Sequence, residues 1–389
     1  MIKLIYNFLL ALGTGFFVSY DIIYFEHYGL GLAIIALVSS MYDLSSAISD
    51  IPLSILFDRV SPRFVLLIGN AMRIIGFLIF FIDPTNIALV ALGQILAGIG
   101  GASESGAVDA LVINDRLSKG ESARSILAIL LRLNAVSTVV GAGLGYFIYS
   151  WDPRYIWIAA AITYVISTLL LFIMSIDPPQ KMEASNGVSN LWSSLITSGR
   201  ILVRRQEAWL ILLGNAAALG AFFTWQAKFF NINDSPNMVF IALVVMKIGI
   251  FISSFFIGKF DLKEYGLIGV IIFNCTGLAA LATSNLPLLL VGGFLTHVTC
   301  QSILIQVLGA ALHETLPNDL RATAFSVLAC FDSAAVVVVA PLVGIAAEHV
   351  SLGSGIAVSG ILYIPILLVL VWRIRNMDRL DTSNLVKSD

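Results

Sequence analysis

Charged side chains interrupt the long apolar stretches of this 389-residue sequence, and they are its candidates for binding ions or a substrate. Four acids, Glu104, Asp21, Asp43 and Asp332, lie inside such stretches. A charge held in an apolar environment is costly, so a carboxylate kept there commonly belongs to an ion or proton pathway. We therefore take these four acids as candidates for binding and releasing a proton.

Aromatic and basic side chains in the same stretches could bind a small molecule. Tyr20 and Tyr24 lie close to Asp21 in the sequence, and an acid among aromatic rings suits a cationic or amphiphilic ligand. The alternative is that these rings form an ordinary aromatic belt at a membrane interface. The other candidates for lining a substrate cavity are Arg132, Trp225, Lys228, Lys247 and His297.

Several of these candidates also have a purely structural interpretation. Glu104 either binds a proton or forms a salt bridge with Arg132. Lys228 either binds an anion or extends its amine toward the membrane interface. His297 either titrates in the physiological range or is a packed, hydrogen-bonded core residue.

The composition defines the environment of these residues. Apolar residues make up 58% of the chain and charged residues 12%, whereas soluble domains carry about 25% charged residues. The chain therefore lacks the polar residues to cover a globule in water. This indicates a multi-pass integral membrane protein, which we expect in the plasma (inner) membrane. The three cysteines lie in apolar segments and are expected to be small core residues.

About twelve stretches are long enough to cross a bilayer, and they must be helical because lipid cannot satisfy free backbone groups. The sequence thus predicts an all-α membrane protein. The expected spans cover residues 5–25, 31–56, 64–82, 86–112, 123–148, 155–176, 209–230, 238–258, 266–283, 286–311, 322–347 and 353–373.

One long connection divides the chain. We expect an N-terminal six-helix bundle over 1–176, a cytoplasmic linker over 177–208, and a C-terminal six-helix bundle with a short cytoplasmic tail over 209–389. Residues 191–203 place apolar side chains at helical spacing, which predicts an amphipathic helix on the inner leaflet. A plain solvated linker is the alternative.

The distribution of basic residues predicts the orientation. With the N-terminus inside, 17 of the 22 Lys and Arg residues lie on the cytoplasmic side, and Arg154 alone lies in an outer loop. Cytoplasmic loops carry the excess of basic residues in membrane proteins. Both termini are therefore expected in the cytoplasm.

A short basic turn joins the second and third expected spans. Residues 57–64 read Phe-Asp-Arg-Val-Ser-Pro-Arg-Phe. This turn resembles the loop between the second and third helices of major facilitator superfamily transporters, whose pattern is roughly Gly-x-x-x-Asp-Arg-x-Gly-Arg-Arg. Ser54 stands in place of the first Gly, Asp58 and Arg59 are kept, and Ser61-Pro62-Arg63 replaces the end. The resemblance implies a latch on the inner side formed by Asp50, Ser54, Asp58, Arg59 and Arg63.

The resemblance covers essentially the whole chain and implies two pseudo-symmetric six-helix bundles, with the substrate near the midplane between them. Phe57-Asp58 recurs as Phe260-Asp261, at an offset of about 200 residues. By such offsets Asp43 aligns with Lys247, and Arg132 with Asp332. In the family these helices face each other across the domain boundary, which predicts one central polar belt of these four residues.

The expected function is secondary active transport of a small organic molecule by alternating access, with protons as the coupling ion. We expect a monomer in the lipid bilayer, with no cofactor, no metal, no nucleic-acid partner and no enzymatic activity. Proton-coupled export of an amphiphilic or drug-like compound is the first expectation. The alternatives are uptake of a metabolite (a sugar, organic anion or peptide) and, outside this class, a non-transporting receptor or scaffold.

Overall fold

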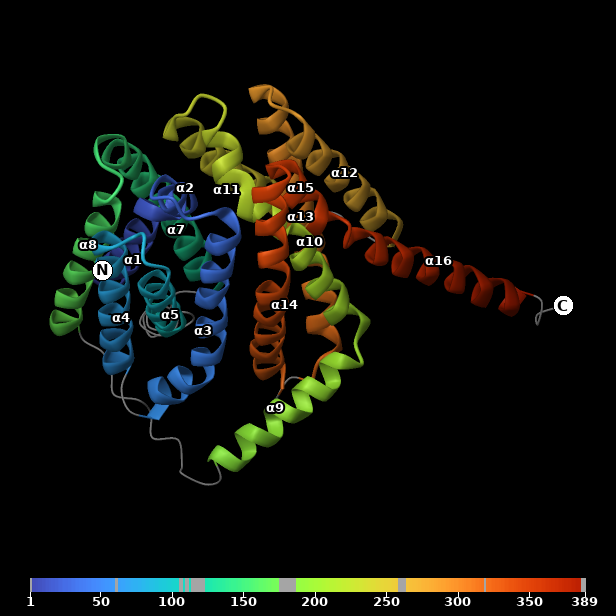
Figure 1. Cartoon of the computed structure of the whole chain (residues 1–389). Helices are drawn as coiled ribbons and strands as arrows, with labels where there is room; N and C mark the ends of the chain where they lie inside the picture. The colour runs from blue at the N-terminus through green and yellow to red at the C-terminus, as the bar shows by residue number, and fades with distance from the viewer. Residues whose placement is uncertain are drawn as a thin grey trace.

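The computed structural model describes residues 2–59, 62–104, 123–174, 187–257, 264–317 and 320–385, with Val108 and Val112, and this part of the chain is helical with no β-strand (Figure 1). The first half of the molecule consists of α1 (Ile2–Val18), α2 (Asp21–His27), α3 (Leu32–Arg59), α4 (Pro62–Ile82), α5 (Ile87–Glu104), α7 (Ala123–Trp151) and α8 (Tyr155–Ile173). The second half consists of α10 (Gln206–Phe230), α11 (Pro236–Ile257), α12 (Glu264–Thr283), α13 (Pro287–Thr315), α14 (Arg321–His349), α15 (Leu352–Gly360) and α16 (Tyr363–Leu385).

The helices match the number of membrane crossings expected. Eleven described spans are long and apolar enough to cross a bilayer, and the last of them runs through α15 and α16. α1 and α2 form a twelfth if they are counted as one span bent by 40°. The prediction of an all-α, twelve-span membrane protein is thus confirmed, while the side on which the two termini lie stays a prediction.

A helix lies in the predicted linker. α9 (Gly187–Val203) crosses one end of the molecule and packs on α14 and α10 (Figure 1). Its Ser198 and Leu202 are buried, whereas Ile196 and Val203 are exposed. We call this end the α9 side, which the sequence predicts to be cytoplasmic. The domain boundaries at residues 176 and 208 stay a prediction.

Glycines allow close helix packing within the first half. A Cβ added at Gly141 on α7 would lie 2.9 Å from the Cα of Gly15 on α1. Gly145, one turn further along α7, abuts the backbone of Phe16. The Gly141–Gly145 run therefore brings α7 against α1, because no other residue is small enough for this separation.

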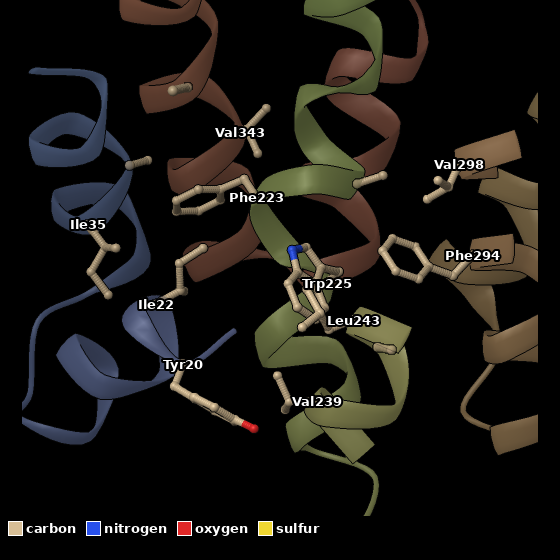
Figure 2. Close-up of a cluster of buried hydrophobic side chains, with 14 of the residues drawn as sticks. Tyr20, Ile22, Ile35, Phe223, Trp225, Val239, Leu243, Phe294, Val298 and Val343 are labelled. Atoms are coloured by element: carbon tan, nitrogen blue, oxygen red, sulfur yellow. The ribbon is translucent and has the colours of Figure 1, made fainter. Parts of the chain in front are cut away.

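The two halves meet along α3 and α14, which lie side by side in the centre of the molecule (Figure 1). Away from the α9 side, Glu348 Oε2 accepts a 2.8 Å hydrogen bond from the backbone N–H of Ala33. Apolar residues of both halves belong to one core cluster there. Figure 2 shows Ile22 and Ile35 of the first half next to Phe223 and Val343 of the second. The end of the molecule opposite α9 is therefore closed in this structure.

Candidate functional site

A buried ion pair joins α4 and α5 in the first half. Arg73 Nε lies 3.0 Å from Glu104 Oε1, and the two side chains are 7% and 15% exposed. Arg73 Nη2 donates to the Tyr42 hydroxyl at 3.2 Å, and Tyr164 donates to Glu104 Oε2 at 3.3 Å. The expected alternative partner of Glu104, Arg132, is instead exposed on α7. Glu104 is therefore neutralised by Arg73 on α4, and Arg132 on α7 is not its partner.

A first cavity among the described residues lies inside the first half, beside this ion pair. It has a volume of about 280 Å³. Its polar lining includes Asp21, Tyr42, Asp43, Arg73 and Gln94. Its aromatic lining consists of Phe17, Phe77, Phe80 and Trp157. The cavity therefore combines flat apolar rings with charged groups.

The second cavity lies between the halves and has a volume of about 510 Å³. Carboxylates from both halves line it, Asp43 from α3 and Asp332 from α14, and they are close enough to interact electrostatically. The other polar lining residues are the neutral Asn215, Gln301, Ser302, Gln306 and Ser333. Asp43 lines both cavities, so it is the residue that connects the two candidate sites.

The structure brings together only part of the expected polar belt. Asp43 and Asp332 face one cavity, as the repeat predicts. Neither Arg132, which is exposed, nor Lys247, which is half-buried, lines either described cavity. Among the residues that the structure describes, these two bases form no ion pair with the two acids.

The two tyrosines beside Asp21 form hydrogen bonds with neighbouring helices. Tyr20 donates a 2.9 Å hydrogen bond to the carbonyl of Ala142, and Tyr24 a 2.6 Å bond to the carbonyl of Phe80. Both side chains are fully buried. They line neither of the two described cavities, so they act here as structural residues that fix α2 against α7 and α4.

Three of the substrate candidates on the second half, Trp225, Lys228 and His297, also lie away from the two described cavities. Trp225 stacks on Phe294 with ring centroids 5.7 Å apart. Lys228 donates to Asn285 Oδ1 at 3.2 Å, within its own half. His297 is fully buried and hydrogen-bonded, which agrees with its interpretation as a packed core residue.

The expected inner latch falls largely outside the described residues. The side chains of Ser54, Asp58 and Arg59 are not among those described, so their gating role stays a prediction. Arg63 Nη2 donates to the carbonyl of Met174 at 2.7 Å, which ties the start of α4 to the end of α8. Asp50 is half-buried on α3.

One side chain bridges the two halves at the break between α1 and α2. Gln226 Nε2 on α10 donates to Asp21 Oδ1 at 2.6 Å and to the Val18 carbonyl at 3.1 Å. Its Oε1 accepts from the backbone N–H of Ile22 at 3.0 Å. The bend exposes the backbone groups that Gln226 satisfies. Asp21 therefore contacts the opposite half while also lining the first cavity.

Sequence reasoning missed Arg73 as the partner of Glu104, and it assigned no role to the amides Gln226, Gln301 and Asn215. Neutral amides inside apolar spans are a usable signal, because an amide buried in lipid needs hydrogen-bond partners. Gln226, which directly follows Trp225 in an apolar span, is such an amide.

The family model of the Major Facilitator Superfamily matches residues 4–263. This chain belongs to the major facilitator superfamily. The protein is therefore a transporter that works by alternating access, and not an enzyme. Its sequence matches no curated protein.

Solved transporters share this fold. The nucleoside transporter NupG is 16% identical with a TM-score of 0.74, and the match covers 97% of this chain and 98% of that one. A D-xylose–proton symporter is 14% identical with a TM-score of 0.68, covering 95% and 94%. The inward open xylose transporter XylE from E. coli is 14% identical with a TM-score of 0.66, covering 95% and 93%. At these identities the likeness concerns the fold alone.

Proposed function

We propose that this transporter carries a small, polar, uncharged or cationic solute rich in hydroxyl or amine groups, and that protons drive it. The observation behind this proposal is the lining of the cavity between the halves. Two carboxylates and five amide or hydroxyl side chains line it, and no basic residue is among the described lining. Such groups recognise a solute through directional hydrogen bonds, which a purely apolar molecule cannot return.

The same lining argues against an organic anion as the substrate. A second negative charge next to Asp43 and Asp332 would meet repulsion in a region where water does not screen it. Export of an amphiphilic compound, the first expectation from the sequence, has less support than uptake or exchange of a polar metabolite. NupG and the D-xylose–proton symporter, which share the fold, are named for polar, hydroxyl-bearing substrates.

Asp43 and Asp332 are the proposed proton carriers. When both are charged they repel each other across the cavity, and a proton on either relieves that repulsion. Asp332 shares the cavity wall with Asn215, and its Oδ1 is buried without a hydrogen-bond partner among the described residues. Because the two acids belong to opposite halves, proton binding changes the attraction between the halves, as alternating access requires.

The test is transport in liposomes containing the purified full-length protein. Uridine and D-xylose represent polar solutes, tetraphenylphosphonium an amphiphilic cation, and benzoate an anion. We expect a pH gradient to drive accumulation of a polar solute. Asp43→Asn and Asp332→Asn should lose this accumulation while retaining exchange at equal pH, because only proton binding is removed.

Asp83→Asn is the matched control, since Asp83 lies in the exposed turn after α4 and its Oδ1 accepts from the backbone N–H of Thr85 at 3.1 Å. This variant should transport like the unmodified protein. Transport of tetraphenylphosphonium or benzoate, with neither polar solute moved, would overturn the proposal.

A further inference from the structure

A buried chain of hydrogen bonds runs through the second half and ends at the cavity between the halves. His297 Nδ1 lies 2.6 Å from Asn274 Oδ1, and Asn274 Nδ2 donates to the Tyr363 hydroxyl at 2.9 Å. Tyr363 in turn lies 2.6 Å from Gln301 Oε1, and Gln301 Nε2 lies 2.9 Å from the Gly214 carbonyl. The four side chains are at most 5% exposed, and Gln301 lines the cavity.

The backbone of α10 fixes the direction of this chain. The carbonyl of Gly214 only accepts, so Gln301 must present its amide nitrogen there, and its oxygen therefore faces Tyr363. Tyr363 must then donate its O–H to that oxygen and accept from Asn274. This places the oxygen of Asn274 opposite His297, which must carry its proton on Nδ1. Reversing any member would set two acceptors or two donors face to face.

This arrangement leaves one N–H group of Gln301 available to bind a ligand. Its amide has two N–H groups, of which one is bonded to Gly214. Within the described part of the chain, no residue accepts from the other. Because Gln301 lines the cavity, that N–H is a donor held in a fixed orientation at the cavity wall.

We infer that Gln301 determines specificity by donating this hydrogen bond to an acceptor oxygen of the solute, and that Tyr363, Asn274 and His297 are positioning residues behind the wall. The inference rests on the proposed function, since it assumes that the solute occupies this cavity. The solute therefore carries a hydroxyl or carbonyl oxygen that faces α13. The second ring nitrogen of His297, Nε2, is buried without a partner among the described residues, so the ring contributes to the chain through Nδ1 alone.

The transport test uses Tyr363→Phe, which keeps the ring and removes the O–H that orients Gln301. In liposomes with uridine or D-xylose, we expect the half-saturating concentration to rise about tenfold with the maximal exchange rate nearly unchanged, as for loss of one net hydrogen bond. Gln301→Glu, which lacks the N–H, should raise it further. Thr276→Val is the control, because Thr276 is exposed on α12 and its hydroxyl donates to the Phe273 carbonyl of the same helix.

Deoxy analogues of the transported probe then locate the oxygen. In the unmodified protein, one analogue should bind about tenfold more weakly than its parent. In Tyr363→Phe the same analogue and its parent should bind equally well, because the hydrogen bond is already lost there. If every analogue loses affinity equally in both proteins while the unmodified protein transports the probe, Gln301 does not select the solute. This inference is then wrong, and the proposed function still stands.

A second measurement is independent of the solute. In the ¹⁵N spectrum of histidine-labelled protein, His297 should be protonated on Nδ1 and bare on Nε2, and this signal should vanish in His297→Gln. Protonation on Nε2 would reverse the chain and overturn the inference whatever the transport result. If His297 shows the expected tautomer but the unmodified protein moves no polar probe, the proposed function fails, and the solute-binding role of Gln301 fails with it.

Discussion

The two halves bury polar groups at equivalent places but satisfy them differently. Gly76 packs against Gly93 between α4 and α5, and Gly277 packs against Gly293 between α12 and α13. In each case an added Cβ would lie 2.8 Å from the partner's carbonyl oxygen. Beside this shared contact the first half holds the Arg73–Glu104 ion pair. At positions about 200 residues later, the second half holds the neutral chain of Asn274, His297, Gln301 and Tyr363.

The difference shows that helix packing determines where a polar cluster can lie, but not whether that cluster is charged or neutral. An ion pair supplies strong attraction, but either partner becomes very costly once it is alone in a low-dielectric interior. A neutral amide chain costs less to disturb and has a definite donor–acceptor direction. The first half is thus suited to respond to charge, and the second half to orient a ligand.

The largest expected effect comes from breaking the ion pair. Arg73→Met leaves Glu104 buried and uncompensated, which should cost about 3–5 kcal/mol of stability. Adding Glu104→Gln should recover most of that loss, because no lone charge remains. Thermal unfolding in detergent, with the folded fraction measured by size exclusion, checks both variants.

Arg373→Met is the control for this first prediction. Arg373 Nη2 pairs with Glu207 Oε1 at 2.6 Å at the partly exposed end of the second half, 21% and 17% exposed. Its loss should cost about 1 kcal/mol or less. If the single and double variants at Arg73 and Glu104 unfold alike, the ion pair is not a coupled unit and the contrast between the halves disappears.

A smaller effect is expected from the neutral chain. Asn274→Leu removes the acceptor for His297 and a donor to Tyr363, which should cost about 1–3 kcal/mol. Combining it with His297→Leu should cost little more, since the donor left without a partner is also removed. The same unfolding measurement applies, and a loss as large as that of Arg73→Met would contradict the distinction between charged and neutral clusters.

The smallest effect on stability is expected at the Asp21–Gln226 bond, where a carboxylate of the first half meets a neutral amide of the second. Gln226→Leu keeps the packing but removes the bonds to Asp21, Val18 and Ile22, and Asp21 regains water whenever the halves separate there. We expect the equilibrium to shift toward conformations in which the two halves are separated at this bond. A Ser19→Cys reporter, at a position that is fully buried, should react severalfold faster with an impermeant maleimide.

Lys228→Met is the control for this last prediction, because the hydrogen bonds of Lys228 to described residues go to Ala282 and Asn285 in its own half. It should leave the labelling rate of the Ser19→Cys reporter unchanged. Equal acceleration by both variants would mean that the reporter senses a general loosening of α10 and not the bond between the halves.

The class of this protein and the number and approximate limits of its spans could be predicted without a structure. Lipid leaves a hydrophobic stretch no choice but a helix of bilayer length, so composition and length are sufficient. Depth could also be counted along each span, which is why Asp43 and Asp332 were expected at one level and are found lining one cavity. The close packing through Gly141 likewise follows from a visible run of small residues.

Which polar groups meet could not be predicted in this way and depends on how the helices pack. Glu104 and Arg132 were expected at similar depth, but the rotation of α7 about its axis exposes Arg132, and Arg73 on the adjacent α4 takes its place. Gln226 and Gln301 gain their roles from the docking of one helix on another, which turns an inconspicuous amide into a bond between the halves or a donor in a cavity. Periodicity and depth specify a position along a helix, whereas the direction of a side chain depends on how every neighbouring helix packs.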